Sequence, residues 1–358
     1  MSRIYNFCAG PAVLPEEALE NARDQLLDYK GSGMSILESS HRGREYSEIH
    51  EEAIANYREL LGLSDDYETL FIQGGASLQF AMVPMNFLGS GKIADYVRSG
   101  AWAVKAVKEA ERIGKVNIAA DSADDRPAAM PKESDLNLTE KAAYVHITSN
   151  ETIAGTQWKE FPRTDAPMIA DMSSDILSRP IDMSRFGMIY AGAQKNLGPA
   201  GAALVVIRKD LAEQAYQDIP TMLKYSAYIE KNSLFNTPPC FTIYMMTLVS
   251  RWIKSVGLET LYRRNAEKAA KIYEVIDSSD FYTGTALPEY RSDMNVTFRL
   301  PTEELEALFV DEASQADLKG LKGHRSVGGL RASIYNAFPV EGVEALCSFM
   351  NEFERRHG

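Results

Sequence analysis

The chain has 358 residues, of which 45% are hydrophobic and 25% charged, and its formal net charge is −12. This composition is typical of a globular protein of one or two domains and excludes disordered, collagen-like and mucin-like classes. Nucleic acids and anionic membranes attract basic surfaces, so the acidic balance argues against both as partners. A small anionic substrate is compatible with this charge only where basic residues gather locally.

The N-terminal segment and the cysteines indicate where the protein is located and whether it binds a metal. Residues Met1–Gly10 lack a basic stretch followed by an apolar core, and apolar runs such as Ala202–Ile207 are too short to span a membrane. Cys8, Cys240 and Cys347 are odd in number and show no Cys-x-x-Cys spacing. This pattern argues against a disulfide framework and against a structural zinc. We therefore expect a cytoplasmic protein without a metal site.

Helical and strand-like segments alternate along the first 256 residues. Apolar residues at helical spacing predict helices, and short apolar runs predict strands. In chain order we predict helices at Pro15–Tyr29 and Tyr46–Leu61, a strand at Thr69–Ile72, a helix at Leu78–Phe87, a strand at Lys92–Val97, a helix at Ala101–Ile113, strands at Ala143–Thr148, Met168–Ala170, Met188–Tyr190 and Ala203–Arg208, and a helix at Thr242–Val256. This order predicts an α/β fold with a mainly parallel sheet covered on both faces.

The pattern changes after the helix that ends at Val256. A sequence of helix, strand and helix follows, with a strand at Met294–Leu300 and a closing helix at Pro339–Arg356. This change predicts a smaller α+β domain at the C-terminal end, with a boundary near Gly257.

Lys195 lies in a segment rich in Gly and Ala between the strands at Met188–Tyr190 and Ala203–Arg208. A lysine at the end of a buried strand is only partly hydrated, which lowers the pKa of its amine and makes it a nucleophile toward an aldehyde. The alternative is a solvated loop lysine, the usual setting of this residue type. The small residues around Lys195 favour the first interpretation.

Asp171 stands where the apolar strand Met168–Ala170 ends. Open α/β sheets bind their ligands at the carboxyl ends of their strands, so this carboxylate is a candidate to face a cofactor. A carboxylate in that place keeps a pyridine nitrogen protonated, and the protonated ring withdraws electrons from a substrate carbanion. The alternative is a helix N-cap, for which Asp171, Ser173 and Ser174 are all suitable.

Gly74 and Gly75 connect a strand to the start of a helix that contains Ala76 and Ser77. Free backbone N–H groups at a helix N-terminus form a phosphate site, and glycine allows the phosphate to approach closely. The segment matches neither the dinucleotide-binding nor the Walker pattern. It therefore becomes informative only in combination with Lys195 and an acidic partner.

Two further residues are candidates for contacts with a planar ligand. Trp102 begins a helix after a turn, where an indole can stack on a ring, although core packing is the more frequent use of tryptophan. Thr152 has a hydroxyl that can donate to a ring oxygen. It carries no information alone.

Basic residues gather in two His-Arg pairs. His41-Arg42 lies near the start of the chain, and His324-Arg325 lies in a glycine-rich segment shortly before Arg331. Arginine binds carboxylate and phosphate bidentately, and flanking glycines let a loop close over a ligand. A charged surface loop is the alternative for either segment alone. Two such segments in an acidic chain favour recognition of an anionic substrate.

Taken together, these segments resemble the phosphoserine aminotransferases, a family of fold-type I pyridoxal-phosphate enzymes among the class V aminotransferases. The resemblance runs from Asn6 to Gly358. The blocks that carry it are Ser40–Gly43, Ala170–Pro180, Tyr190–Asn196, Phe235–Pro239 and Lys322–Gly329. It implies a large domain at residues 16–256 with a mainly parallel seven-stranded sheet, and a small α+β domain built from residues 1–15 and 257–358.

The resemblance also implies roles for the candidate residues. It implies that Lys195 holds pyridoxal 5′-phosphate as a Schiff base, Asp171 pairs with the pyridine nitrogen, Trp102 stacks on the ring and Thr152 contacts its hydroxyl. The cofactor phosphate is assigned to Ala76, Ser77 and Gln194, joined by Asn236 and Thr237 of a second subunit, so that a homodimer completes the site. The substrate carboxylate is assigned to Arg331, and the substrate phosphate to His324, Arg325 and the pair His41 and Arg42, donated across the dimer.

The predicted reaction is the reversible transamination of 3-phosphohydroxypyruvate with L-glutamate to O-phospho-L-serine and 2-oxoglutarate. The family also acts on 3-hydroxy-2-oxo-4-phosphonooxybutanoate, which gives 4-phosphohydroxythreonine in vitamin B6 synthesis. Cys240 and the pair Cys8-Ala9 depart from common family patterns. A lyase or desulfurase with a mobile cysteine and a regulator without catalysis are the rival hypotheses. The presence of Lys195 together with Asp171 argues against the regulator.

Overall fold

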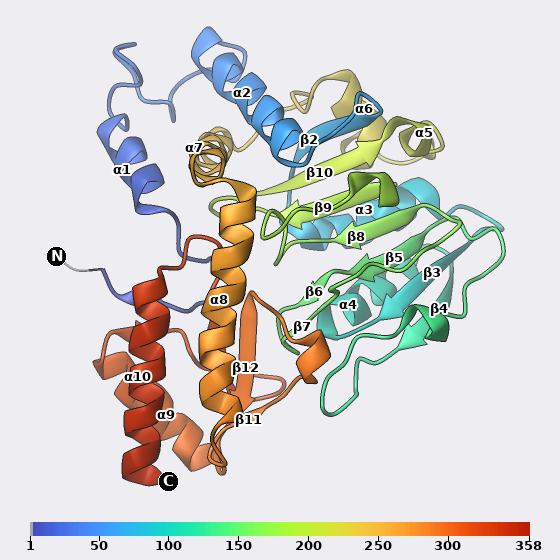
Figure 1. Cartoon of the computed structure of the whole chain (residues 1–358). Helices are drawn as coiled ribbons and strands as arrows, with labels where there is room; N and C mark the ends of the chain where they lie inside the picture. The colour runs from blue at the N-terminus through green and yellow to red at the C-terminus, as the bar shows by residue number, and fades with distance from the viewer. Residues whose placement is uncertain (1–2) are drawn as a thin grey trace.

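A twisted sheet of seven strands forms the centre of the molecule in the computed structural model, which describes residues 3–358 (Figure 1). In spatial order its strands are β2 (Tyr67–Gln73), β10 (Ala202–Arg208), β9 (Met188–Gly192), β8 (Met168–Asp171), β5 (Val145–Thr148), β3 (Ile93–Arg98) and β4 (Lys115–Asp121). Strand β10 is antiparallel to both of its neighbours, and the remaining pairs are parallel. The predicted mainly parallel seven-stranded sheet is confirmed.

Helices cover both faces of this sheet. One face packs against α1 (Glu16–Asp24), α2 (Arg44–Leu60) and α7 (Cys240–Val256), and the other packs against α3 (Gly75–Phe87), α4 (Ala101–Ala110), α5 (Lys209–Ala212) and α6 (Tyr225–Glu230). Side chains of β10 alternate between the two cores: Leu204 and Val206 face the first, and Val205 and Ile207 face the second. A strand buried on both faces has this near-continuous apolar sequence.

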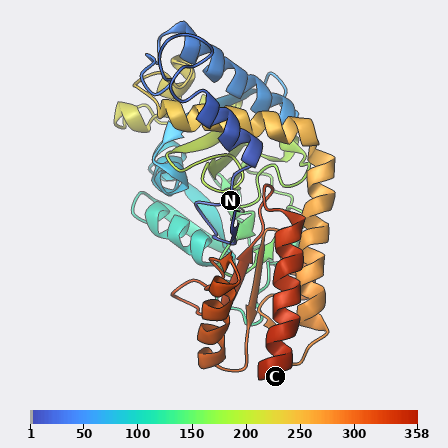
Figure 2. The same cartoon turned by 90° about the vertical axis from the view of Figure 1, so that its left-hand side faces the viewer.

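The C-terminal part has its own core and lies below the main sheet in Figure 2. Its elements are α8 (Leu258–Asp277), the antiparallel strands β11 (Thr283–Gly284), β12 (Asn295–Arg299) and β14 (Leu330–Ser333), and the helices α9 (Glu303–Gln315) and α10 (Val340–His357). The short strand β1 (Tyr5–Asn6) pairs with β13 (Leu318–Lys319), and Phe7 enters this core. The two ends of the chain are therefore packed together, while the predicted division into two domains stays a prediction.

Helices α7 and α8 meet at Gly257, whose φ of 85° favours glycine. Helix α8 contributes Leu261 to the first core and Ile272 to the C-terminal core. It therefore connects the two packed parts of the molecule.

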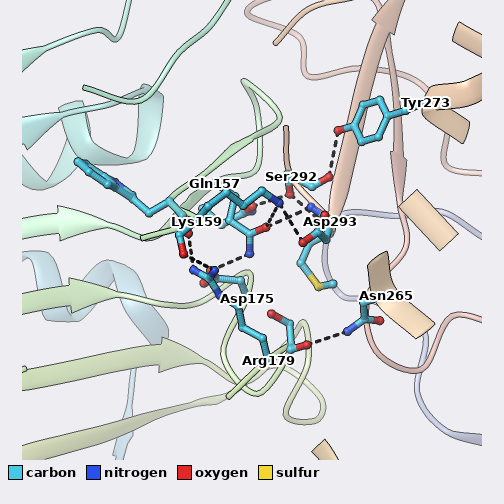
Figure 3. Close-up of polar contacts among 12 residues, drawn as sticks. Gln157, Lys159, Asp175, Arg179, Asn265, Tyr273, Ser292 and Asp293 are labelled. Atoms are coloured by element: carbon cyan, nitrogen blue, oxygen red, sulfur yellow. Dashed lines mark hydrogen bonds and ion pairs between the residues drawn. The ribbon is translucent and has the colours of Figure 1, made fainter. Parts of the chain in front are cut away.

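A polar network also joins these parts (Figure 3). Gln157 Nε2 donates to Asp175 Oδ2 over 3.1 Å, and Lys159 Nζ pairs with Asp293 Oδ2 over 2.9 Å. Asn265 Nδ2 donates to the carbonyl of Ser178 over 3.1 Å. These contacts link the turn after Asp171 to helix α8 and to the loop before β12.

Four elements of the structure differ from the predictions made from sequence or were absent from them. Helix α1 ends at Asp24 rather than at Tyr29, and Leu27 beyond it is 88% exposed, so a longer helix would bury no apolar face there. The edge strand β4 was not predicted, because its outer residues are only partly buried and lack a continuous apolar run. Helix α9 and strand β14 were also unassigned. Within residues 3–358 no helix is long and apolar enough to cross a membrane.

Candidate active site

The candidate residues meet where the parallel strands end. Strands β2, β5, β8 and β9 run in the same direction, so their carboxyl ends lie along one edge of the sheet. The residues that follow these ends include Gly74 and Gly75 after β2, Thr152 after β5, and Lys195 after β9, while Asp171 is the last residue of β8. Trp102 belongs to the first turn of α4, which follows β3. Ligands of open α/β sheets bind at this edge.

Lys195 is buried, with only 8% of its surface exposed. Its Nζ donates to Thr152 Oγ1 over 2.7 Å and lies 5.8 Å from the centre of the Trp102 ring. The pKa of Lys195 is lowered to about 8, mainly by burial, with the charge of Asp171 opposing the shift and the positive charge of Arg331 adding to it. A substantial neutral fraction therefore exists near pH 8, and the amine is not that of a solvated loop lysine.

Asp171 is also buried, and its Oδ1 accepts hydrogen bonds from Ser173 N at 2.9 Å and Ser173 Oγ at 2.6 Å. Burial raises the pKa of Asp171, whereas these hydrogen bonds and Lys195 lower it. Oδ2 accepts no hydrogen bond from residues 3–358 and is left for a ligand. The residues after Asp171 form turns rather than a helix, so the alternative of a helix N-cap is wrong.

Trp102 has one unpaired polar atom in the site. Its Nε1 is buried and has no hydrogen-bond partner in the described part of the chain, and Lys105 Nζ lies 3.9 Å above the ring centre. The half-buried indole, with Lys195 on the same side of the site, suits a planar ligand that stacks on its ring. Lys105 could not be predicted from the sequence, because no distinguishing motif surrounds it.

The backbone at the start of α3 is uncapped. Gly74 and Gly75 have φ values of 89° and 63°, which favour glycine, and no side chain caps the helix. The first N–H groups, near Ala76 and Ser77, are thereby left for an anion.

Three further residues were predicted to contact the cofactor phosphate. The carbonyl of Gln194 accepts a hydrogen bond from Ala12 N over 2.9 Å, which ties the N-terminal segment to the loop of Lys195. Thr237 is exposed, and its carbonyl accepts from Gln73 Nε2 of the same chain over 2.6 Å. Asn236 donates to that same carbonyl over 3.4 Å. These last two residues therefore lie beside the end of β2.

Arg331, on strand β14, reaches the site from the C-terminal part. Its Nη1 donates to the carbonyl of Thr152 over 3.5 Å, and its Nε is buried without a partner in residues 3–358. Burial lowers the pKa of Arg331. The structure thus brings a partly unsatisfied guanidinium close to Lys195, as an anionic substrate group requires.

The two His-Arg pairs are placed differently. His324 lies in the loop between β13 and β14, where burial lowers its pKa, helped by the charges of Arg331, Lys105 and Arg325. It is therefore near the mouth of the site. His41 and Arg42 lie in the segment between α1 and α2, and within this chain the structure shows no contact between them and the other candidate residues.

Cys347 and Cys240 are poorly suited to nucleophilic chemistry. Burial raises the pKa of Cys347, on α10, to about 11, and burial also raises the pKa of Cys240 at the start of α7. A thiol with a raised pKa stays protonated at neutral pH and is a weak nucleophile. This finding disfavours the lyase or desulfurase hypothesis.

Glu151 is a buried site residue that was not predicted from the sequence. It has no exposed surface, and its carboxylate accepts hydrogen bonds from the backbone of α4. Burial raises the pKa of Glu151 to about 7, against the hydrogen bonds that lower it. Its partners are distant in sequence, so no local pattern reveals it.

Comparisons with known proteins agree with this arrangement. The model of the class-V aminotransferase family matches residues 4–346. The chain belongs to the class-V aminotransferase family. It is 57% identical, over 99% of both chains, to a phosphoserine aminotransferase of Desulfosudis oleivorans.

Solved structures extend the similarity. This aminotransferase matches the phosphoserine aminotransferase of Bacillus circulans subsp. alkalophilus with a TM-score of 0.98 and 54% identity over 99% of both chains. It matches the pyridoxal-phosphate-bound phosphoserine aminotransferase of Trichomonas vaginalis with a TM-score of 0.94 and 42% identity, over 98% of this chain and all of the other. The fold-type I architecture is therefore confirmed.

Proposed function

We propose that this class-V aminotransferase uses pyridoxal 5′-phosphate to transfer an amino group from L-glutamate to 3-phosphohydroxypyruvate, giving 2-oxoglutarate and O-phospho-L-serine. The observation that carries the proposal is the buried Lys195, whose pKa is lowered to about 8 beside Asp171, Thr152 and Trp102. The full-length relatives at 54–57% identity support the choice of substrates.

The residues present fit this cofactor. The amine of Lys195 suits an aldehyde, the free Oδ2 of Asp171 suits a protonated pyridine nitrogen, and the uncapped start of α3 suits a phosphate. The unpaired Nε1 of Trp102 and the face of its ring suit a flat polar ligand. When bound, pyridoxal phosphate supplies an electron-withdrawing ring that weakens the bond between the substrate Cα and its hydrogen.

Lys195 supplies the proton transfers. Its Nζ takes the proton from the substrate Cα as a general base and later returns a proton as a general acid. Thr152 Oγ1, 2.7 Å away, accepts from Nζ and orients the amine. A pKa of about 8 lets the same nitrogen serve as acid and base near neutral pH.

Different basic residues bind the two anionic groups of the substrate. We assign the α-carboxylate to Arg331, whose guanidinium is half-buried beside Thr152, and the phosphate to His324 and Arg325. A buried guanidinium gives strong directional binding, the exposed Arg325 attracts the more highly charged phosphate, and His324 offers a ring nitrogen as a hydrogen-bond donor. Pyruvate and glyoxylate carry only the carboxylate.

Substrate comparison tests this assignment. Glutamate-driven turnover should show a much higher kcat/KM for 3-phosphohydroxypyruvate than for pyruvate or glyoxylate. Equal kcat/KM values for the three keto acids would contradict the proposed substrate.

We also propose a homodimer in which each chain contributes to the site of the other. Leu27 and Leu37 are 88% and 59% exposed in the segment before His41 and Arg42, and Phe235, next to Asn236, is 40% exposed. Exposed apolar side chains of this kind mark interaction surfaces, and here they flank the residues that the resemblance assigns to a partner.

Mixed dimers test the shared site. Lys195→Ala and Arg42→Ala chains are each inactive or impaired, but one site of their mixed dimer combines Lys195 of one chain with Arg42 of the other. Unfolding and refolding an equal mixture should restore about a quarter of the wild-type sites by random pairing. Absence of any recovery, with mixed dimers shown by mass spectrometry, would place Arg42 in its own chain's site or outside it.

The finer assignments belong to the same proposal. The second substrate is 3-hydroxy-2-oxo-4-phosphonooxybutanoate, for vitamin B6 synthesis. The cofactor phosphate is bound by Ala76, Ser77 and Gln194, together with Asn236 and Thr237 of a partner. The chain divides into a large domain at residues 16–256 and a small domain formed by the remainder, and the protein is located in the cytoplasm.

A further inference from the structure

Glu151 connects two loops on which the proposed cofactor site depends. Its Oε2 accepts a hydrogen bond from Trp102 N over 3.1 Å, and its Oε1 accepts from Ala103 N over 3.0 Å and from Ser99 Oγ over 3.4 Å. The side chain is fully buried, so water does not compete for these donors. One carboxylate thus holds the first turn of α4, which carries Trp102.

The backbone of Glu151 is fixed independently of α4. It belongs to β6 (Asn150–Glu151), which pairs with β7 (Thr156–Gln157), and its carbonyl accepts from Gly155 N over 2.8 Å. The next residue, Thr152, accepts the hydrogen bond from Lys195 Nζ. The distance between the tryptophan ring and the lysine amine is therefore set through Glu151.

Gly100 leaves the space that this carboxylate occupies. A Cβ atom at residue 100 would lie 2.5 Å from Glu151 Cδ and 2.7 Å from its Oε2. The carboxylate cannot move away without losing the two amide donors of α4. Any larger residue at position 100 would therefore displace Glu151.

We propose that Glu151 is a positioning residue for the cofactor, acting through Trp102 and Thr152. This inference rests on the proposed function for the identity of the cofactor. The Glu151 carboxylate is bonded to Ser99, Trp102 and Ala103, and its effect is transmitted by the hydrogen bonds to α4 and by the chain connection to Thr152.

Two substitutions disturb the contact between the Glu151 carboxylate and the backbone of α4 in different ways. Glu151→Gln replaces one acceptor oxygen with an NH2 group that faces a backbone N–H, and Gly100→Ala pushes the intact carboxylate away. Leaving a buried backbone N–H without its acceptor corresponds to about a tenfold or larger effect. We expect each variant to raise the dissociation constant of pyridoxal phosphate about tenfold, and the double variant to add little, because both changes break one contact.

The measurement combines equilibrium dialysis with fluorescence on protein freed of cofactor. Bound pyridoxal phosphate should quench the fluorescence of Trp102. The chain has three tryptophans, and the part of the quenching that is lost in Trp102→Phe is the contribution of Trp102. That contribution should fall in Glu151→Gln and Gly100→Ala. Asp182→Asn is the matched control, since Asp182 also accepts from a backbone N–H, of Ser184, but is exposed.

The outcomes separate this inference from the proposed function. If wild-type protein does not bind pyridoxal phosphate, the proposed function is wrong. If it binds, and both variants keep the wild-type dissociation constant and Trp102 quenching, the role of Glu151 is wrong. If Glu151→Gln does not fold by circular dichroism, Gly100→Ala decides alone, because it retains the carboxylate. Additive effects in the double variant would also contradict the inference.

Discussion

The cofactor side and the substrate side of the site differ in how far one chain determines their geometry. Lys195 and Asp171 are at most 8% exposed and have hydrogen-bond partners from the sheet edge. Arg42 and Arg325 lie on exposed loops. Buried groups obtain fixed positions and shifted pKa values from their surroundings, whereas exposed cations act through long-range attraction and become ordered by what they bind. The catalytic groups are therefore preorganised within one chain, whereas selectivity for the phosphorylated substrate depends on the ligand and on the partner chain.

The largest expected effect is at Lys195. Lys195→Ala should lower the rate of transamination by at least about 10²- to 10⁴-fold, because the acid–base group is lost. Mass spectrometry after borohydride reduction should also no longer detect the covalently attached cofactor. Lys115→Ala, a change at an exposed lysine, serves as the control. A variant that keeps the attached cofactor would show that another lysine holds it.

A smaller loss is expected at Asp171. Asp171→Asn can still accept the hydrogen bonds from Ser173 but loses the charge that favours a protonated pyridine nitrogen. We expect a fall in kcat of about 10- to 100-fold, the range for hydrogen bonds to charged groups. Steady-state kinetics at saturating pyridoxal phosphate measures it. An unchanged kcat would remove Asp171 from the chemistry and leave it a structural role.

On the substrate side the effect should depend on the substrate. Arg325→Ala should lower kcat/KM for 3-phosphohydroxypyruvate about tenfold and leave that for pyruvate unchanged, because only the former carries a phosphate. Raising the ionic strength should reduce the difference, as expected for exposed charges. Equal losses for both keto acids would indicate a general role of this loop instead of phosphate recognition.

The smallest predicted effect concerns pH. The neutral amine of Lys195 is the reactive form, so protein freed of cofactor should capture pyridoxal phosphate faster as the pH rises, with a midpoint at about 8. Between pH 7 and pH 8 the rate should increase several-fold, following the fraction of neutral amine. Stopped-flow absorbance measures this rate. A midpoint near the ordinary lysine pKa of 10.5 would show that burial does not act on Lys195 as described.

Part of the site could be predicted because its residues stand next to strong local patterns. Lys195 and Asp171 follow apolar strands, and parallel strands present their carboxyl ends at one edge. The glycine pair at the start of α3 is likewise visible in the sequence, since only glycine adopts its backbone angles readily. The edge strand β4 was not predicted because a half-exposed strand has a weak apolar pattern.

Local sequence patterns were enough to predict the α/β class, the mainly parallel sheet and the residue types at its edge, because periodicity and strand ends are local properties. The tertiary structure alone decided the antiparallel direction of β10, the closeness of Arg331 to Lys195, and the clamp of Glu151 on α4. These features depend on contacts between residues far apart in the chain. The burial that lowers the pKa of Lys195 also results from the whole fold and is invisible to any local pattern.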